Sequence, residues 1–217
     1  MEKSEVLERI RTVGLIPVVR LSTSQDAMEV ADALREGGAS LIEITMTVPG
    51  ALDVIRDLSL RYGSEILVGA GTVLDAETGR AAILSGAQFL VSPAIDLGLI
   101  QLANRSNVLA IPGAMTPTEI LTSWNAGADM VKVFPVAQLG GAGYIKALRG
   151  PLPHIPLVPT GGVNLQNAAS FIRAGAAALG AGGELVDKRL VREKKFHLIR
   201  DNTEAFLNAV RDARQVE

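Results

Sequence analysis

One lysine, Lys132, interrupts a short apolar run, Asp129-Met-Val-Lys-Val-Phe-Pro135, that is typical of a buried strand in a parallel sheet. Burial in apolar surroundings disfavours the ammonium form, so it lowers the pKa of a lysine and provides a neutral amine near pH 7. Such an amine can attack a carbonyl substrate and form a Schiff base. A lysine at a strand end can instead extend its ammonium into solvent, and the rest of the chain must decide between these interpretations.

A carboxylate, Glu43, stands in a second apolar run, Leu41-Ile-Glu-Ile44. A buried carboxylate costs several kcal/mol unless it is paired or protonated. A structural salt bridge to Arg20 or to Lys132 would explain it. A proton-transfer role is compatible with that pairing, because a buried glutamate near a buried lysine can have its pKa tuned into the range of acid–base catalysis.

Two glycine-rich turns late in the chain, Thr160-Gly-Gly162 and Gly180-Ala-Gly-Gly183, suggest an anion site. Glycines let backbone N–H groups approach an anion closely. One glycine pair more often marks a tight turn than a ligand site. Two such turns are a stronger signal if each follows a strand and the two strands end at the same edge of a sheet.

Composition favours a small-molecule ligand. Hydrophobic residues make up 48% of the 217 residues but aromatic residues only 4%, so the core must consist mainly of Ala, Val, Ile and Leu. The net charge of −2 provides no field for gripping a nucleic acid, and nucleic-acid binding is not expected. No apolar segment has the roughly 18 residues that a membrane span needs, and the N-terminus is charged, so we expect a cytoplasmic protein without a membrane partner.

The residues offer little to a metal ion. The chain has no cysteine, and its two histidines are far apart, His154 among prolines and His197 in a C-terminal helical region. Both are predicted to lie on the surface. A disulfide framework, a thiolate cage and a histidine cluster are therefore excluded. The remaining metal alternative is Mg²⁺ held by carboxylates, but no paired Asp or Glu motif at a strand end suggests it, so we expect neither a metal nor a cofactor.

The elements that must position these residues form a regular series. After a helix near residues 4–11, strands are predicted at residues 14–20, 41–45, 66–70, 89–91, 108–111, 130–134, 157–159 and 177–179, with helical patterns between them. This order predicts right-handed βαβ units, and eight of them predict an α/β fold, a single (β/α)8 TIM barrel with an extra N-terminal helix. Residues 1–217 would form one catalytic domain.

Similar phrases precede alternate strands, and their glycines, Gly38, Gly86, Gly127 and Gly175, are 48, 41 and 48 residues apart. Four related quarters would explain this spacing. Convergent chemistry of short turns between helices and strands would explain it equally well. The count of eight strands is the same under both explanations.

A barrel of this kind assembles its chemistry at the C-terminal ends of the strands. There the sequence places Arg20, Glu43, Thr47, Thr72, Pro93, Lys132, Phe134 and Thr160, and the two glycine turns follow strands seven and eight, a frequent phosphate site. Glu43 and Lys132 both belong to even-numbered strands, so their side chains are expected in one layer of the barrel interior.

These segments resemble a known family. Glu43-Ile-Thr45, Gly69-Ala-Gly-Thr-Val73, Val91-Ser-Pro93, Pro112-Gly-Ala-Met-Thr-Pro-Thr-Glu119, Lys132-Val-Phe-Pro135 and Thr160-Gly-Gly-Val163 are similar to segments of the class I aldolases that cleave 2-keto-3-deoxy-6-phosphogluconate and 4-hydroxy-2-oxoglutarate. The resemblance covers nearly the whole chain. It implies a barrel, commonly a homotrimer, that uses no metal.

The resemblance also implies roles for individual residues. Lys132 would be the Schiff-base lysine and Glu43 the general acid/base, while Thr72 and Thr160 would place hydroxyls near bound pyruvate. Gly161, Gly162, Gly182 and Gly183 would bind the phosphate end.

Two positions depart from many members of the family. Thr47 stands where an arginine often holds the substrate carboxylate, and Gly183 stands where a serine often helps to bind phosphate. Because a guanidinium can grip a carboxylate in bidentate fashion, we assign the carboxylate to Arg20. The substrate-binding set is then Arg20, Thr47, Thr72, Pro93, Phe134 and Thr160.

The predicted function is a class I aldolase that acts through a lysine Schiff base. It would cleave 2-keto-3-deoxy-6-phosphogluconate to pyruvate and glyceraldehyde 3-phosphate, and/or 4-hydroxy-2-oxoglutarate to pyruvate and glyoxylate. Three alternatives remain at this point: an aldolase for 2-keto-3-deoxy-6-phosphogalactonate, a phosphosugar isomerase or epimerase, and a non-catalytic sensor of a phosphorylated ligand. Only an aldolase needs Lys132 as a covalent nucleophile.

Overall fold

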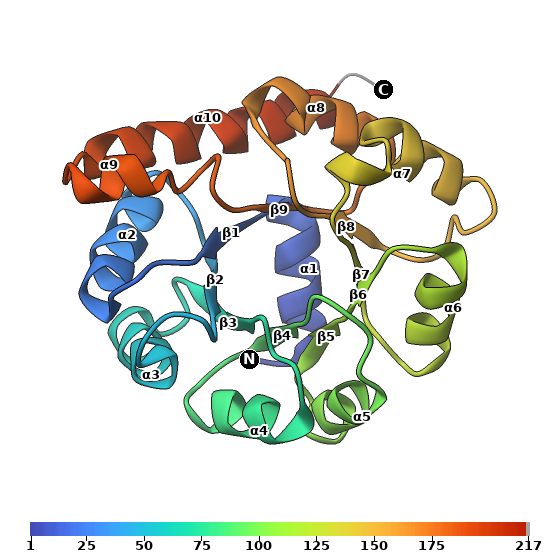
Figure 1. Ribbon diagram of the computed structural model, residues 1–217, viewed down its shortest axis with the longest axis horizontal. Coiled ribbons are helices and arrows are strands. Elements are labelled where there is room, and N and C mark those ends of the chain that lie inside the picture. The colour runs from blue at the N-terminus through green and yellow to red at the C-terminus, as the bar shows by residue number, and fades with distance from the viewer. Residues whose placement is uncertain (216–217) are drawn as a thin grey trace.

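The computed structural model describes residues 1–215, in which parallel strands lie inside a ring of helices (Figure 1). The strands are β1 Leu15–Val19, β2 Leu41–Thr45, β3 Leu67–Gly71, β4 Phe89–Val91, β5 Leu109–Ile111, β6 Gly113–Ala114, β7 Val131–Val133, β8 Leu157–Pro159 and β9 Leu179–Ala181. The helices are α1 Lys3–Val13, α2 Ser24–Glu36, α3 Ala51–Tyr62, α4 Ala76–Leu84, α5 Leu97–Arg105, α6 Pro117–Asn125, α7 Ala142–Arg149, α8 Leu165–Arg173, α9 Lys188–Arg192 and α10 Phe196–Arg214, with a 3-10 turn η1 Ala137–Leu139. The predicted α/β class is confirmed.

The strands pair in parallel as two sheets. One sheet has the order β5-β4-β3-β2-β1-β9 and the other has the order β6-β7-β8. A parallel bridge between Thr160 and Gly180 connects the second sheet to the first beyond the end of β8. At the opposite side, only Pro112 separates β5 from β6, and its carbonyl accepts a hydrogen bond of 2.9 Å from the Lys132 N–H. The sheets therefore curl around a shared interior.

Five predicted strands differ in their bounds; those at residues 14–20, 66–70 and 130–134 differ by one residue at each end, and the other two differ more. The strand expected at residues 108–111 continues as two segments, β5 and β6, because Pro112 has no N–H to donate to a ladder. The last strand lies at Leu179–Ala181 instead of 177–179, so it includes Gly180, which the pattern of residue types assigned to a loop. An added Cβ at Gly180 would lie 2.2 Å from Oγ1 of Thr160, so a glycine is required for this close approach.

The N-terminal helix packs against the strand ends. Helix α1 begins with a capping box formed by Glu2 and Glu5 and extends from Lys3 to Val13. It buries Val6 and Ile10 against a cluster that includes Phe89 and Met130. In Figure 1, α1 lies behind the centre of the ring.

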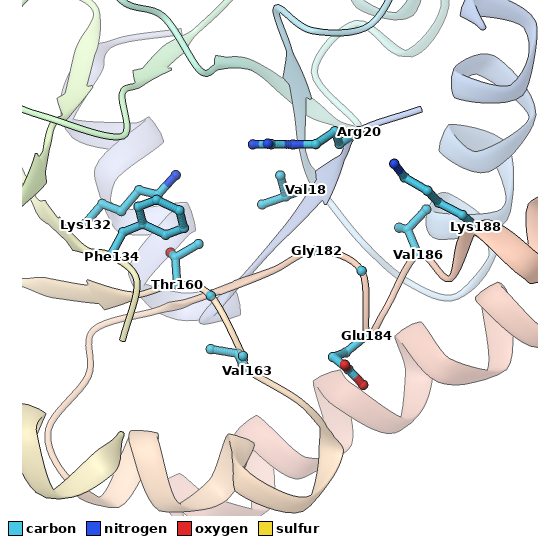
Figure 2. A pocket seen from close by; sticks show the side chains of 13 residues that line it. Val18, Arg20, Lys132, Phe134, Thr160, Val163, Gly182, Glu184, Val186 and Lys188 are labelled. Atoms are coloured by element: carbon cyan, nitrogen blue, oxygen red, sulfur yellow. The ribbon is translucent and has the colours of Figure 1, made fainter. Parts of the chain in front are cut away.

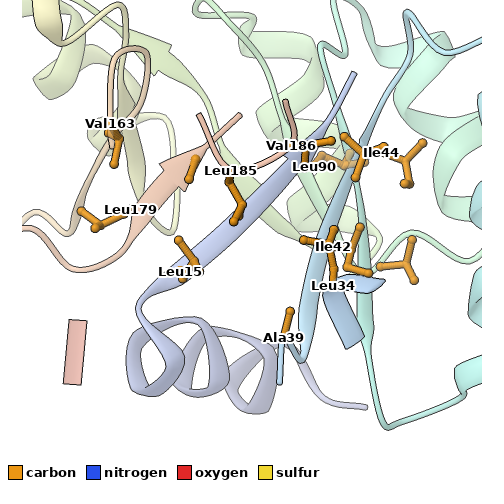
Figure 3. Close-up of a cluster of buried hydrophobic side chains, with 14 of the residues drawn as sticks. Leu15, Leu34, Ala39, Ile42, Ile44, Leu90, Val163, Leu179, Leu185 and Val186 are labelled. Atoms are coloured by element: carbon orange, nitrogen blue, oxygen red, sulfur yellow. The ribbon is translucent and has the colours of Figure 1, made fainter. Parts of the chain in front are cut away.

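A second, larger cluster lies between the strands and the outer helices (Figure 3). Side chains alternate between the two faces of a strand, and β1 to β5 and β8 each contribute to both clusters. In β2, Ile42 and Ile44 belong to the outer cluster, whereas Leu41 belongs to the inner one. Glu43 follows Leu41 by two residues and therefore faces inward. By the same rule Lys132 faces inward, because its neighbours Val131 and Val133 belong to the outer cluster.

None of the helices described over residues 1–215 is long and apolar enough to cross a membrane.

Candidate active site

Lys132 is a buried lysine at the centre of β7. Only 4% of its surface is exposed, and its Nζ lies 5.0 Å from the centroid of the Phe134 ring. Burial lowers the pKa of the Lys132 ammonium, the nearby Glu43 carboxylate raises it, and the positive charge of Arg20 lowers it. Burial is the largest of these effects. The neutral amine, which is the nucleophilic form, is therefore favoured compared with an ordinary lysine.

Glu43 is a buried carboxyl group, 3% exposed, on the inner face of β2. Burial raises its pKa above that of an ordinary glutamate, while the charges of Lys132 and Arg20 lower it. The Oε1 atom accepts no hydrogen bond, and Glu43 forms no ion pair across residues 1–215. The structural salt bridge considered from the sequence is therefore not formed. What the structure provides is a carboxyl group that can hold or release a proton.

A cavity of about 230 Å³ opens beside Lys132 (Figure 2). Eight of the residues predicted from the sequence line it: Arg20, Lys132, Phe134, Thr160, Gly161, Gly162, Gly182 and Gly183. They come from four separate places in the chain, namely the end of β1, β7 and its end, the turn after β8 and the turn after β9. The predicted convergence of strand ends at one site is therefore present for these residues.

Arg20 enters the cavity from the end of β1. In Figure 2 its guanidinium points toward the side on which Lys132 lies. Its Nη2 donates a hydrogen bond of 3.2 Å to Oγ1 of Thr72. Thr72 has a φ of 56°, a left-handed conformation that is unusual for a β-branched residue. This contact fixes the guanidinium near Lys132 and leaves other N–H groups free to bind an anion.

Four predicted residues lie outside the cavity lining. Glu43 is buried within the interior, and Thr72 contacts the site through Arg20. Thr47 is exposed, and its hydroxyl lies 2.8 Å from that of Thr45. Pro93 is half-buried and packs on Gly113, where an added Cβ would lie 2.3 Å from the Pro93 carbonyl oxygen. Thr47 and Pro93 are therefore at strand ends but do not face the open volume.

Five lining residues were not predicted: Val18, Val163, Glu184, Val186 and Lys188. Val18 lies in β1, whereas Val163 and Val186 follow β8 and β9, and the three valines line the cavity with apolar surface. Lys188 had no distinguishing signal, because it belongs to a charged segment, residues 187–195, in which basic residues are frequent. Its place at the cavity depends on how the chain turns after β9.

The described residues contain no metal-binding constellation. Within residues 1–215, no group of three or more His, Cys, Asp or Glu side chains could hold a metal ion. His154 and His197 are both exposed, as predicted, and the His154 ring lies 5.9 Å from that of Trp124. With the residues present, this site can add an amine to the carbonyl group of a ligand and transfer protons through a carboxyl group.

The chain is similar in sequence to known proteins. A model of the KDPG and KHG aldolase family matches residues 6–201. A 2-dehydro-3-deoxy-phosphogluconate aldolase of Haemophilus influenzae is 33% identical over 192 residues, which are 88% of this chain and 90% of the relative.

Solved structures agree with the sequence match. A structure described as native KDPGal superposes with a TM-score of 0.85 and 33% identity, over 93% of this chain and 96% of that one. A KDPG aldolase of Legionella pneumophila, with pyruvate captured at low pH as a covalent carbinolamine, superposes with a TM-score of 0.83 and 29% identity, over 89% of this chain and 93% of that one.

Proposed function

Because the chain belongs to the KDPG and KHG aldolase family, we propose that it cleaves 2-keto-3-deoxy-6-phosphogluconate to pyruvate and glyceraldehyde 3-phosphate through a Schiff base on Lys132. The chain is thus a carbon–carbon lyase of the aldolase type. The observation that carries the assignment to Lys132 is a lysine with a lowered pKa, 4% exposed, whose side chain lines a cavity.

The reaction follows from the protonation states of two groups. Neutral Lys132 adds to the C2 ketone, and loss of water gives an iminium that withdraws electrons from the bond between C3 and C4. Glu43, directly or through a water molecule, takes the proton of the C4 hydroxyl while that bond breaks. The aldehyde leaves, the enamine is protonated at C3, and hydrolysis releases pyruvate and the free lysine. Glu43 or water accepts the proton of the C4 hydroxyl during cleavage and returns a proton to C3 of the enamine, so the protons balance over the reaction.

Substrate binding is assigned to the groups around Lys132. Arg20 binds the carboxylate beside the ketone, because its guanidinium lies on the cavity wall and is oriented by Thr72. Thr160 lines the cavity next to Lys132, and Phe134 packs below the amine. Thr47 and Pro93 are included in the proposed substrate-binding set as residues at neighbouring strand ends, outside the cavity lining. The backbone of Gly161, Gly162, Gly182 and Gly183 receives the phosphate end.

The finer architecture is part of the same proposal. Residues 1–217 act as one catalytic domain, and β5 with β6 counts as one strand of a closed (β/α)8 barrel that α1 precedes. The hydrogen bond between Lys132 N–H and Pro112, and the bridge between Thr160 and Gly180, support closure. The homotrimer and the cytoplasmic location stay predictions; light scattering that gives three times the mass of one chain would test the first.

Two other substrates belong to the same chemistry. The similarity to a structure described as native KDPGal makes the phosphogalactonate epimer the second candidate. The family description names KHG as well, which makes 4-hydroxy-2-oxoglutarate, yielding pyruvate and glyoxylate, the third. All three would share Lys132 and differ in the groups beyond C4.

A steady-state comparison tests the proposal. Pyruvate release is followed with each of the three substrates, for the natural chain and for Lys132→Arg, which keeps a cation but has no nucleophilic amine. We expect the phosphogluconate to have the highest kcat/KM and the variant to have no activity above background. Activity of Lys132→Arg at the natural rate would overturn the proposal.

A further inference from the structure

Lys188 is a cationic side chain on the wall of the cavity that none of the assigned roles uses. It is the first residue of α9, which follows the turn after β9. Within residues 1–215, its amine forms no hydrogen bond and no ion pair, although the neighbouring basic residues do. Arg189 pairs with Asp187, Lys194 with Asp26 and Glu29, and Lys195 with Glu193. Lys188 therefore has a free charge directed at a cavity.

The glycine turns leave one side of the cavity without side chains. Gly161 and Gly162 have φ values of 89° and 81°, and an added Cβ at Gly162 would lie 2.4 Å from that of Ala137. A larger residue is thus excluded there. At Gly183, in contrast, an added Cβ would meet no atom within 4 Å. Open space next to Gly183 means that a bound group reaches the backbone without contact to a side chain of residue 183.

The three cations that line the cavity are separated in space. Figure 2 shows Lys132 and Lys188 on opposite sides, with Arg20 between them. Lys132 is reserved for the covalent bond and Arg20 for the carboxylate beside the ketone. The carboxylate of Glu184, the acidic residue of the lining, points away from both Lys132 and Arg20. Lys188 is therefore the cation that remains for the far end of a long substrate.

We propose that Lys188 is a specificity-determining residue that binds the terminal phosphate of the substrate, opposite the backbone of the glycine turns. This inference depends on the proposed aldolase function and adds the charge that selects a phosphorylated keto acid over an unphosphorylated one. A lysine amine is a compact point charge with three donors, which suits a phosphate held from several sides. The contact strengthens binding of the distal group and leaves the chemistry at Lys132 unchanged.

The test compares two substrates that differ only in the phosphate. Lys188→Ala and Lys188→Arg are assayed with 2-keto-3-deoxy-6-phosphogluconate and with 2-keto-3-deoxygluconate, and Lys195→Ala serves as the control. Lys195 is an exposed lysine seven residues along the chain that pairs with Glu193 and does not line the cavity. Because a hydrogen bond between charged groups at an exposed site is moderately strong, Lys188→Ala should lose about tenfold in kcat/KM for the phosphorylated substrate, through KM.

The other measurements separate this role from general damage. Lys188→Ala should leave kcat/KM for the unphosphorylated substrate and borohydride trapping of pyruvate unchanged, and Lys188→Arg should recover most of the loss. Raising the salt concentration should increase KM for the phosphorylated substrate more in the natural chain than in Lys188→Ala. Equal kcat/KM for the phosphorylated substrate in Lys188→Ala and the natural chain would overturn the inference. So would an equal loss for both substrates. A natural chain that cleaves neither substrate would instead contradict the proposed function.

Discussion

The carboxyl group of Glu43 on β2 fills the space that a side chain at Gly71, on the paired strand β3, would otherwise occupy. An added Cβ at Gly71 would lie 1.8 Å from Oε1 and 2.4 Å from Cδ of Glu43. The missing side chain of β3 is therefore what gives the carboxyl group of β2 its position.

This relationship predicts the effect of Gly71→Ala. The methyl group must displace the Glu43 carboxyl group by about 1 Å or more, and a shift of that size in a catalytic group costs on the order of 100-fold in rate. We expect kcat to fall about 10- to 100-fold, measured by pyruvate release. Gly143→Ala is the matched control, because Gly143 lies within α7 and an added Cβ there meets no atom within 4 Å. It should keep full activity, and equal activity of both variants would contradict the role of Gly71.

Glu43→Gln separates proton transfer from imine formation. The amide keeps the shape of the side chain but cannot take the proton of the C4 hydroxyl, so kcat should fall by a factor of about 100 to 10,000. Trapping of pyruvate on Lys132 should persist, because the nucleophile remains. Glu204→Gln, an exposed glutamate of α10, is the control and should behave as the natural chain does. Cleavage at the natural rate in Glu43→Gln would exclude Glu43 as the acid/base.

The pH dependence of imine formation should move in opposite directions in two variants. The Glu43 carboxylate raises the pKa of Lys132 and the Arg20 guanidinium lowers it. Imine formation needs the neutral amine and therefore falls as the pH drops through the pKa of Lys132. Glu43→Gln should shift this acid limb to lower pH, and Arg20→Met should shift it to higher pH. The measurement is the initial rate of borohydride trapping at saturating pyruvate against pH, and shifts of the same sign would contradict this electrostatic account.

The burial of two ionisable groups, Glu43 and Lys132, should cost stability. Burial opposes the charged form of both groups, as the raised pKa of Glu43 and the lowered pKa of Lys132 indicate. Replacing even a buried ion pair by apolar residues of similar size is often stabilising by about 1–4 kcal/mol, and these two groups form no ion pair within residues 1–215 that would offset the cost of their burial. Glu43→Leu combined with Lys132→Met should therefore raise the free energy of unfolding in urea. A double variant less stable than the natural chain would show that the pair stabilises the fold.

Much of this site could be predicted from the sequence because its signals were local. A lysine and a glutamate within apolar runs are anomalies that need no structure to detect, and alternation along the strands then places both in the interior. The split of the fifth strand was missed although Pro112 is visible in the sequence, since a run that continues on both sides of a proline does not show where the ladder stops.

Other features depend on the turn of the chain in space. Lys188 lies at the cavity because of the path between β9 and α9, and no residue type marks it among the basic residues of that segment. Similarly, Thr47 and Pro93 stand at strand ends, as predicted, but the directions of their side chains are set by local contacts with Thr45 and Gly113. Position along a strand is encoded locally, whereas access to a cavity depends on contacts between distant segments.

Whether Lys132 is the nucleophile is decided by identifying the residue that becomes covalently bound to pyruvate. The natural chain is incubated with pyruvate and sodium borohydride, digested, and analysed by mass spectrometry, with Lys132→Arg treated in parallel. The expected result is a reduced pyruvate adduct on Lys132, loss of activity in proportion to labelling, and no such adduct in Lys132→Arg. An active chain without an adduct, or with its adduct on another lysine, would contradict it.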